Sequence, residues 1–495
     1  MTDGERGAQD VAASFAERKH ENYIDGTWVA PSSGTSIPVV DPGRGAAIGT
    51  IAASGVEDVD RAVAAARTNF EAGAWRSLPS ARRSEVLWAI GEGIAAAADE
   101  LVELESLDNG MPVKAARGHV ANAVQCFRYF AGLADKIFGH SSQIQSAGRQ
   151  VLGYTVKEPI GVVGLIVPWN APLRQTVYKV APALAAGCSI VLKPAEETSL
   201  TALRLAEIVT AAGVPAGTFN VVTGEGEPVG SRLTEHPDVD KVSFTGSTSV
   251  GRAIIRAAAG NLKKLTLELG GKSPLVLFDD ADLEKAIPHA AMSIFGNAGQ
   301  VCSAASRLIV HGSIHDEVVQ RIAAFGDGLR LGYRTEDVQL GPLISQVQLD
   351  RVTGYVDGAV EAGAEIVGGD LPTPDEGFFY RPIVVTGVQP KMTVYREEIF
   401  GPVLSALPFD DVDEAVALAN DTRYGLAASV FTGDVGRAHS VASRLRAGRV
   451  GINVHGITDF TMPGGGYKES GWGRENGPDA VDPYLEVKSV FTLLG

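Results

Sequence analysis

The chain has 495 residues, of which 45% are hydrophobic and 21% are charged, and its formal net charge is −16. This length allows a large buried core and two or three structural units, and the charged fraction is ordinary for a globular protein. The acidic balance argues against nucleic acid or an anionic membrane as a partner.

The three cysteines, Cys126, Cys188 and Cys302, are too few for a disulfide framework and are typical of a reducing compartment. None stands at a spacing that predicts a metal site, so we expect no metal. The polar N-terminus shows no secretory signal, and no run approaches ~18 apolar residues, so we expect no membrane span. The cytoplasm is the expected location.

The first third of the chain has the pattern of a helical scaffold. Residues 1 to about 18 are expected to form a loose tail, and Asp25-Gly26 predicts the turn of a hairpin at 23–29. Amphipathic periodicity predicts helices at 56–70, 80–107 and 113–138.

From residue 154 onward, short apolar runs rich in β-branched residues alternate with helical segments. Strands are expected at 161–167, 189–192, 218–222 and 241–244, and helices at 171–187, 199–212, 229–234 and 246–259. This alternation predicts a doubly wound parallel sheet of Rossmann type.

A second α/β pattern begins after Gly270. It places strands at 274–278 and 308–310, helices at 283–295, 317–325 and 347–362, and a completing alternation from 384 to 431. The expected fold class is therefore α/β, with two doubly wound Rossmann-like domains. Two such units form a crevice in which a cofactor and a substrate would meet.

Two segments of the first unit are candidates for a cofactor site. The stretch Gly246-Ser-Thr-Ser-Val-Gly251 opens a helix, whose N-terminal amides suit a pyrophosphate. A Gly-Ser-Thr start is also simply a good N-cap, so the residues alone leave both interpretations open. Lys193 and Glu196 follow a strand, where doubly wound sheets bind ligands, but an exposed charged loop would have the same sequence.

Cys302 is the candidate nucleophile of the second unit. It follows a Gly299-Gln300 step, and Gly299 is expected to let the backbone approach a ligand closely. A thiolate attacks carbonyl carbons and forms a reactive thioester. Isolated cysteines are more often inert core residues, so the residue alone does not decide the function.

Two signatures resemble those of the aldehyde dehydrogenase superfamily. Residues 295–307, with Cys302, resemble the cysteine signature, and residues 265–274, with Glu268, resemble the glutamate signature. With further matches across 168–477, the resemblance covers most of the chain. It implies an NAD(P)-dependent enzyme of the non-acylating type.

The resemblance implies a role for each catalytic residue. The Cys302 thiolate would add to an aldehyde, and the Asn170 amide with the Cys302 backbone N–H would stabilise the alkoxide. After hydride transfer to NAD, water activated by Glu268 would hydrolyse the thioester to a carboxylic acid. A carboxylate in an apolar run has a raised pKa, which suits a general base. Lys179 and Glu475 resemble a pair that relays protons.

The resemblance also implies the cofactor contacts. Glu196 would accept hydrogen bonds from the adenine ribose and repel a 2′-phosphate, which favours NAD over NADP, although Lys193 partly offsets this repulsion. Glu398 would hold the nicotinamide ribose, with Phe400 beside the nicotinamide. The full expected set is Ile166, Val167, Pro168, Trp169, Lys193, Glu196, Gly226, Gly230, Phe244, Gly246, Ser247, Val250, Leu269, Gly270, Glu398 and Phe400.

The substrate pocket departs from the family pattern at three positions. Many family members have aromatic residues where this chain has Ala171, Gly296 and Gly464. The lost volume predicts a wide pocket for a bulky aromatic or terpenoid-like aldehyde. Other expected pocket residues are Tyr178, Trp169 and Phe460.

Other functions stay open at this point. A CoA-acylating dehydrogenase would not need Glu268 to activate water. A betaine- or amino-aldehyde dehydrogenase would need a pocket for a cation, for example an aromatic cage. A cysteine hydrolase would need a histidine partner for Cys302, and His289 is the nearest upstream. A binding protein without activity would not need Cys302, Glu268 and Asn170 together.

The expected organisation has three parts. These are an NAD-binding domain at 19–138 and 160–269, a catalytic domain at 270–475, and an oligomerisation arm at 139–159 and 476–495. The arm is suggested by a hairpin at 147–156 and a strand at 484–493, which would cover a neighbour's sheet edge. We expect a homodimer or homotetramer.

Overall fold

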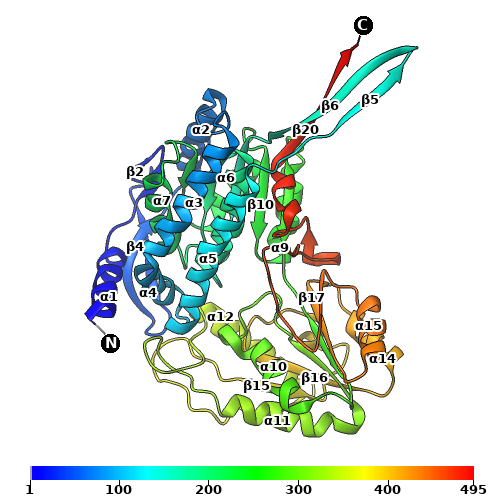
Figure 1. Ribbon diagram of the computed structural model, residues 1–495. Coiled ribbons are helices and arrows are strands. Elements are labelled where there is room, and N and C mark those ends of the chain that lie inside the picture. Colours follow the sequence, from blue (N-terminus) through cyan, green and yellow to red (C-terminus); the bar gives the residue numbers. More distant parts are fainter. Residues whose placement is uncertain (1–2, 495) are drawn as a thin grey trace.

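The structure is a computed structural model and describes residues 3–494. It has two lobes, each built on one large sheet, and a thin β-arm that projects from the upper lobe (Figure 1). Both large sheets are mainly parallel and have helices on both faces. The predicted α/β class with two Rossmann-like sheets is therefore confirmed.

The upper sheet has the strand order β19-β11-β10-β7-β8-β9-β1-β2. Strands β7 to β11 are parallel, and the strands at the two edges are antiparallel. The bounds are β1 (Asn22–Ile24), β2 (Thr27–Val29), β7 (Val162–Ile166), β8 (Ser189–Lys193), β9 (Phe219–Val221), β10 (Lys241–Thr245), β11 (Lys264–Glu268) and β19 (Gly471–Trp472). Strand β19 belongs to the range expected for the catalytic domain, yet it pairs with the upper sheet.

Helices cover both faces of the upper sheet. In β7, Val163 and Leu165 pack with α3 to α7, whereas Val162 and Ile166 pack with α2, α8 and α9. This alternation explains why the strand has a continuous apolar sequence. The bounds are α2 (Val56–Ala72), α3 (Ser80–Ala96), α4 (Ala98–Asn109), α5 (Val113–Leu133), α6 (Pro172–Ala186), α7 (Leu200–Ala211), α8 (Ser231–Glu235) and α9 (Thr248–Ala258).

The lower sheet has the order β14-β15-β16-β13-β12-β17-β18 and is parallel except at β14. Helices α10 and α11 pack on one face, and α12, α14 and α15 on the other. The bounds are β12 (Pro274–Leu277), β13 (Arg307–His311), β14 (Glu365–Val367), β15 (Ile383–Thr386), β16 (Val403–Phe409), β17 (Ala427–Phe431), β18 (Arg449–Ile452), α10 (Leu283–Phe295), α11 (His315–Asp327), α12 (Gln346–Glu361), α13 (Thr393–Arg396), α14 (Val412–Asn420) and α15 (Val435–Arg444).

The expectation of a loose N-terminal tail is wrong for the described residues of that segment. Helix α1 (Asp3–Ala16) packs against α4, and Ala12, Phe15 and Ala16 are buried in the core. These three residues stand at i, i+3 and i+4, so they share one face of a helix. Met1 and Thr2, the first residues of the expected tail, lie outside the described residues.

The helix predicted at 80–107 is two helices, which meet at Ala97 between α3 and α4. The predicted helix at 113–138 ends at Leu133, and that at 229–234 begins two residues late, after a short turn at Gly226–Gly230. A small antiparallel pair, β3 (Ser36–Asp41) and β4 (Ala46–Ala52), lies beside α1 and α4.

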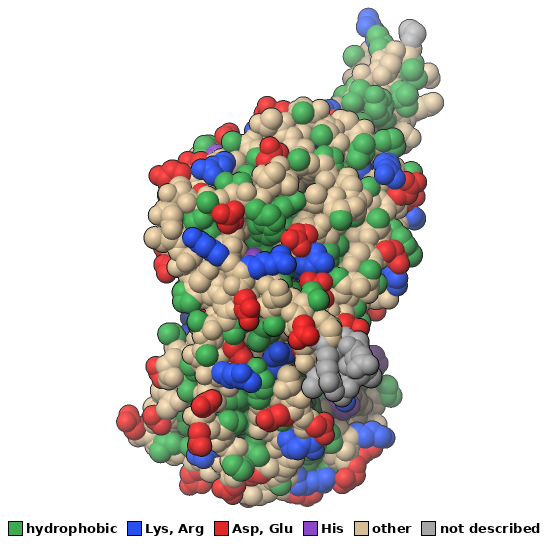
Figure 2. Space-filling view, turned by 90° about the vertical axis from the view of Figure 1, so that its left-hand side faces the viewer, with side chains coloured by type: hydrophobic (Ala, Val, Ile, Leu, Met, Phe, Trp, Pro, Cys, Tyr) green, Lys and Arg blue, Asp and Glu red, His purple; other side chains and the backbone are tan. Residues whose placement is uncertain are grey.

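The β-arm has three strands, β5 (Ser141–Ser146), β6 (Arg149–Pro159) and β20 (Leu485–Leu493), in the order β20-β6-β5. The hairpin is longer than the predicted segment, because Ala147-Gly148 forms its turn, with φ of 49° and 77°. Figure 2 shows hydrophobic side chains gathered where the arm leaves the upper lobe. Tyr154, Val487 and Phe491 are among the exposed apolar residues of the arm.

Candidate active site

The loop that carries Cys302 lies between α10 and β13. Helix α10 ends at Phe295, and Asn297 and Ala298 then take left-handed backbone conformations, each with φ of 51°. Gly299 has φ of +73°, and a Cβ there would lie 2.0 Å from the carbonyl oxygen of Gly401. Gly299 therefore permits close packing of the Cys302 loop against another backbone segment, and its expected approach to a ligand stays a prediction.

Two cavities meet at Cys302. We call the cavity of about 290 Å³ the inner cavity; Glu268 and Tyr178 line it. We call the cavity of about 210 Å³ the cofactor cavity; Gly246 and Glu398 line it. Asn170, Thr245 and Cys302 line both cavities. A group bound in either cavity would therefore lie next to Cys302, which is partly exposed.

The surroundings of Cys302 raise the pKa of its thiol. Burial raises its pKa from 9.0 to about 11, and Glu398 and Glu268 act in the same direction. Arg449 and Arg174 lower this pKa, Arg449 having the larger effect. A proton acceptor must therefore take part when the thiolate forms.

Asn170 lies just after β7, buried beside the Cys302 loop. Its side-chain Nδ2 donates to the carbonyl oxygen of Gln300 at 2.8 Å, and the Nδ2 of Asn297 donates to the Asn170 carbonyl oxygen at 3.0 Å. An amide nitrogen carries two hydrogens, so Asn170 can still donate one to an oxyanion in the cavity. These bonds fix the amide next to Cys302.

Glu268 is the last residue of β11, and its side chain is buried in the wall of the inner cavity. Among the described residues its Oε1 has no hydrogen-bond partner, and a Cβ at Gly465 would lie 2.9 Å from this oxygen. Burial, followed by the charge of Glu475, raises the pKa of Glu268 well above its ordinary value. Such a carboxyl can accept a proton at a physiological pH.

Lys179 and Glu475 form a buried pair next to Glu268. Lys179, on α6, donates to Glu475, and also to the Oγ of Ser243 at 3.2 Å. Glu475 lines the inner cavity together with Glu268, whose pKa it raises while Lys179 lowers it. The structure thus brings all five predicted catalytic residues together.

The N-terminus of α9 borders the cofactor cavity. Ser247 is the N-cap, and its Oγ accepts a hydrogen bond from the backbone N–H of Val250 at 3.3 Å. A Cβ at Gly246 would lie 2.4 Å from the ring of Phe244. Only glycine fits at position 246, and without a side chain there the helix N-terminus stays accessible to an anion, which the positive end of the helix dipole favours.

Glu398 reaches the opposite wall of the cofactor cavity. Its Oε1 accepts a hydrogen bond from the Gly271 backbone N–H at 3.0 Å, and burial raises its pKa to about 7. A Cβ at Gly270 would lie 2.3 Å from Oε2 of Glu398. The rings of Trp169 and Phe400 meet edge to face, 5.2 Å apart.

The predicted cofactor residues do not all line this cavity. Pro168, Trp169, Gly246, Ser247, Leu269, Gly270, Glu398 and Phe400 do. Lys193 and Glu196 form an ion pair of 2.7 Å at the carboxyl end of β8, next to Val167, whose N–H donates to the Lys193 carbonyl. Those that line neither cavity are Ile166, Val167, Lys193, Glu196, Gly226, Gly230, Phe244 and Val250.

The predicted substrate residues are only partly at the inner cavity. Tyr178, Gly296 and Gly464 line it. Ala171 is buried at the start of α6 and does not line it. Phe460 lies behind the wall, where its ring contacts that of Tyr178 at 5.7 Å between centroids. The assignments of Ala171 and Phe460 to the substrate pocket therefore stay predictions.

Sequence reasoning missed several residues of the inner cavity, above all Arg174, Arg449 and His455. The ring of His455 contacts the carbonyl oxygen of Ser303 at 2.7 Å, and burial lowers its pKa. Arg174 lies in the first turn of α6, four residues after Asn170, and this nearness in sequence is the signal that could have found it. No local signal marks Arg449 or His455.

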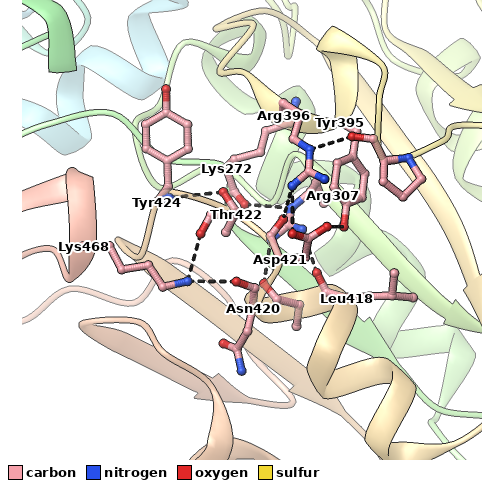
Figure 3. Close-up of polar contacts among 12 residues, drawn as sticks. Lys272, Arg307, Tyr395, Arg396, Leu418, Asn420, Asp421, Thr422, Tyr424 and Lys468 are labelled. Carbon is pink, nitrogen blue, oxygen red and sulfur yellow. Dashed lines mark hydrogen bonds and ion pairs between the residues drawn. The ribbon is translucent and has the colours of Figure 1, made fainter.

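Arg307, which ends the cysteine signature, has a structural role at the start of β13 (Figure 3). Its guanidinium donates to the carbonyl oxygens of Lys272, Leu418 and Ala419 at 3.0, 2.9 and 2.7 Å. The guanidinium carbon lies 5.4 Å from the ring centre of Tyr395. Arg307 therefore fixes the base of the Cys302 loop without entering either cavity.

Within residues 3–494, no group of three His, Cys, Asp or Glu side chains could hold a metal ion. The helices of the same range include none that is long and apolar enough to cross a membrane.

Comparison with known proteins agrees with this geometry. The model of the aldehyde dehydrogenase family matches residues 28–490. Aminoacetaldehyde dehydrogenase of Pseudomonas aeruginosa is 44% identical over 475 residues, which are 95% of this chain and 95% of that protein.

Solved structures are similar over nearly the full length. The NAD+ complex of an aldehyde dehydrogenase from Bacillus cereus has a TM-score of 0.95 and 41% identity, and the match covers 97% of this chain and 98% of that one. Betaine aldehyde dehydrogenase from Staphylococcus aureus, in complex with NAD+, has a TM-score of 0.94 and 40% identity, and the match covers 98% and 97%.

Proposed function

The chain belongs to the aldehyde dehydrogenase family, and we propose that it oxidises an aldehyde to a carboxylic acid with NAD as the hydride acceptor. The observation that carries this proposal is the position of Cys302 between two cavities. One cavity has a carboxyl group with a raised pKa, and the other is lined by a helix N-terminus and by Glu398.

The residues of the cofactor cavity fit a dinucleotide. Gly246 and the N-terminus of α9 would receive the pyrophosphate, since backbone N–H groups and the helix dipole favour an anion there. Glu398 would bind the nicotinamide ribose, and Glu196 the adenine ribose. The nicotinamide supplies an acceptor for hydride. A carboxylate at Glu196 disfavours a 2′-phosphate, which supports NAD over NADP, as do the NAD+ complexes of two similar structures.

The proposed nucleophile is the Cys302 thiolate. It adds to the aldehyde carbon and forms a thiohemiacetal alkoxide. The free Nδ2 hydrogen of Asn170 and the backbone N–H of Cys302 are the donors proposed for the oxyanion. Because burial raises the pKa of Cys302 to about 11, a base must take the thiol proton, and the acceptor proposed is Glu268, which lines the same cavity.

The proposed general base is Glu268. Glu268 lines the inner cavity, and its Oε1 has no hydrogen-bond partner among residues 3–494, so a water molecule in the cavity could donate a proton to this carboxyl group. Loss of that proton makes the water nucleophilic, and attack on the thioester releases the acid and restores the thiol. The proton would leave Glu268 through Glu475 and Lys179, the pair that already acts on its pKa.

We also propose a bulky substrate, as expected from the sequence, but one of limited size. The cavity of about 290 Å³ is near the lower end of ligand pockets, which are roughly 300–1,000 Å³. A Cβ at Gly296 would lie 3.8 Å from Cε of Met292, and one at Gly464 would lie 3.9 Å from Cζ of Arg449. Larger side chains thus adjoin both glycines, and we propose a substrate of about the size of a benzaldehyde.

We also propose that the protein is a cytoplasmic homo-oligomer and that the three parts expected from the sequence carry cofactor, catalysis and assembly. The proposal for the arm is supported by its exposed apolar side chains, among them Val487 and Phe491, exposed by 62% and 65%. A double change, Val487→Asp with Phe491→Asp, should give a monomer in light scattering. An unchanged oligomer mass would contradict the role of the arm.

The test of the proposed function is a panel of aldehydes offered with NAD or NADP, with and without CoA, with the reduced cofactor measured. We expect turnover with NAD in the absence of CoA. Turnover only with CoA would show that Glu268 is not a base for water and would favour the CoA-acylating alternative. No turnover with any aldehyde would contradict the proposed function.

A further inference from the structure

Two arginines line the inner cavity without an acidic partner. Arg174 lies in the first turn of α6 and Arg449 begins β18, so the two lobes contribute one each. The Nε atom of each guanidinium is buried and has no hydrogen-bond partner among the described residues. Within residues 3–494, neither side chain takes part in an ion pair.

This arrangement suits an anionic ligand. A guanidinium stays charged and presents five N–H donors. Both side chains are half-buried, and of each guanidinium only the Nε atom is among the buried atoms without a partner. Two guanidinium groups that share one cavity without an acidic ion-pair partner favour an anion between them.

The other charged groups of the cavity do not supply this anion. Glu475 is paired with Lys179. Glu268 forms no ion pair with either arginine within residues 3–494, although the charge of Arg449 acts on its pKa. Arg474 donates to the carbonyl oxygens of Gly466 and Gly473 and adds another positive charge nearby. Asp459, further out, accepts hydrogen bonds from Thr461.

Both arginines are close enough to the nucleophile to act on one small molecule with it. The charges of Arg449 and Arg174 each lower the pKa of the Cys302 thiol. Arg449 also lines a second, outer cavity of about 420 Å³. Gly464 leaves the space beside Arg449 open, because a Cβ there would already lie 3.9 Å from its Cζ.

We propose that the substrate carries a carboxylate besides its aldehyde group, and that Arg174 and Arg449 bind this carboxylate while the aldehyde carbon lies at Cys302. This inference rests on the proposed function and specifies its substrate class. A carboxylate matches the planar guanidinium and can accept two parallel hydrogen bonds from it. The same charges repel an ammonium group, so the betaine- and amino-aldehyde alternatives are disfavoured for this chain.

A rival explanation is that the arginines serve only to favour the Cys302 thiolate. The two explanations differ in one measurable respect. A carboxylate-binding role affects acidic aldehydes selectively, mainly through KM. A role in forming the thiolate affects all aldehydes equally and shifts the pH profile.

The experiment compares each acidic aldehyde with a neutral one of nearly the same shape. Para-formylbenzoate is paired with para-isopropylbenzaldehyde, and succinic semialdehyde with isocaproaldehyde. In at least one of the two pairs we expect kcat/KM to be about 10- to 100-fold higher for the acid than for its neutral partner, the effect of a charge-assisted hydrogen bond. Arg174→Met and Arg449→Met should bring this ratio close to one, mainly by raising KM for the acid.

The matched control is Arg444→Met. Arg444 ends α15, is exposed, and pairs with Asp413 at 2.7 Å, and its replacement should leave the ratio unchanged. A wild-type preference for the neutral member of both pairs would overturn the inference. Equal losses for acid and neutral aldehydes in the Arg174 and Arg449 variants would also overturn it and support the rival explanation.

A binding measurement separates this inference from the proposed function. In the Cys302→Ala variant, calorimetry should show tighter binding of terephthalate than of para-isopropylbenzoate, and Arg449→Met should remove the difference. If the enzyme oxidises neutral aldehydes but the variant binds terephthalate no more tightly than para-isopropylbenzoate, the proposed function stands and the carboxylate site is refuted. If terephthalate binds more tightly but no aldehyde is oxidised, the proposed function is refuted and the carboxylate site stands.

Discussion

The ligand-free Cys302 should react with iodoacetamide more slowly than an ordinary thiol. Only the thiolate is alkylated, and burial raises the pKa from 9.0 to about 11. At about pH 8 the thiolate fraction is then roughly one in a thousand instead of one in ten. A thiolate of higher pKa is intrinsically more nucleophilic, by about 10-fold for this shift. The net expectation is a rate about 10-fold below that of the ordinary thiol.

The assay is peptide mapping by mass spectrometry after timed exposure to iodoacetamide at a series of pH values. The rate should rise about 10-fold per pH unit up to roughly pH 10 without a plateau, because the thiolate fraction rises in this way below the pKa. Cys126 and Cys188 are completely buried with raised pKa values and should not be labelled. A plateau below about pH 9 would refute the reasoning, since it would place the pKa at or below that of a free thiol.

The Arg449→Met variant extends this test. Arg449 lowers the pKa of Cys302, so its removal should slow the labelling further, whereas Arg444→Met should have no effect. Faster labelling of the Arg449 variant would contradict the electrostatic argument.

Further predictions concern the base, its neighbour and the Cys302 loop. Glu268→Gln should keep a burst of NADH but lower the steady-state rate of NADH formation roughly 10²- to 10⁴-fold. Rapid-mix kinetics measure both phases, and an unchanged steady-state rate would argue against Glu268 as the base. Glu475→Gln removes a charge that raises the pKa of Glu268, so the acidic limb of the kcat–pH profile should move to lower pH; a shift to higher pH would contradict the pairing. Gly299→Ala should destabilise the protein by about 1–2 kcal/mol from its left-handed backbone alone, and further through the contact with Gly401. Calorimetry should show a lower Tm for Gly299→Ala but not for Gly354→Ala, which meets nothing within 4 Å, and equal Tm values would contradict the packing argument.

The sequence was informative about the strands of both sheets. Buried parallel strands such as β7 and β8 have continuous apolar, β-branched sequences, which local patterns reveal. Helix α1 was missed because only Ala12, Phe15 and Ala16 mark its buried face among many polar residues. Helix boundaries such as the break at Ala97 depend on packing and were not visible in the periodicity.

The same distinction applies to the site. Cys302 and Glu268 stand in recognisable motifs, and the structure brings them to one cavity. Arg449 reaches this cavity from a strand of the lower lobe, and its meeting with Arg174 follows only from the way the lobes pack. The lost aromatic volume at Gly464 was visible in the sequence. The sequence did not show that the guanidinium of Arg449 lies next to that space, because the neighbours of a glycine depend on tertiary structure.

The central claim is that the aldehyde becomes a thioester on Cys302 that water activated by Glu268 removes. The most direct test is to mix the Glu268→Gln variant with NAD and an aldehyde, quench it, and locate the added acyl group by mass spectrometry. The account predicts one acyl group per chain, on the peptide that contains Cys302. A variant that forms NADH without any acyl group on Cys302, or that carries the group on another residue, would contradict it.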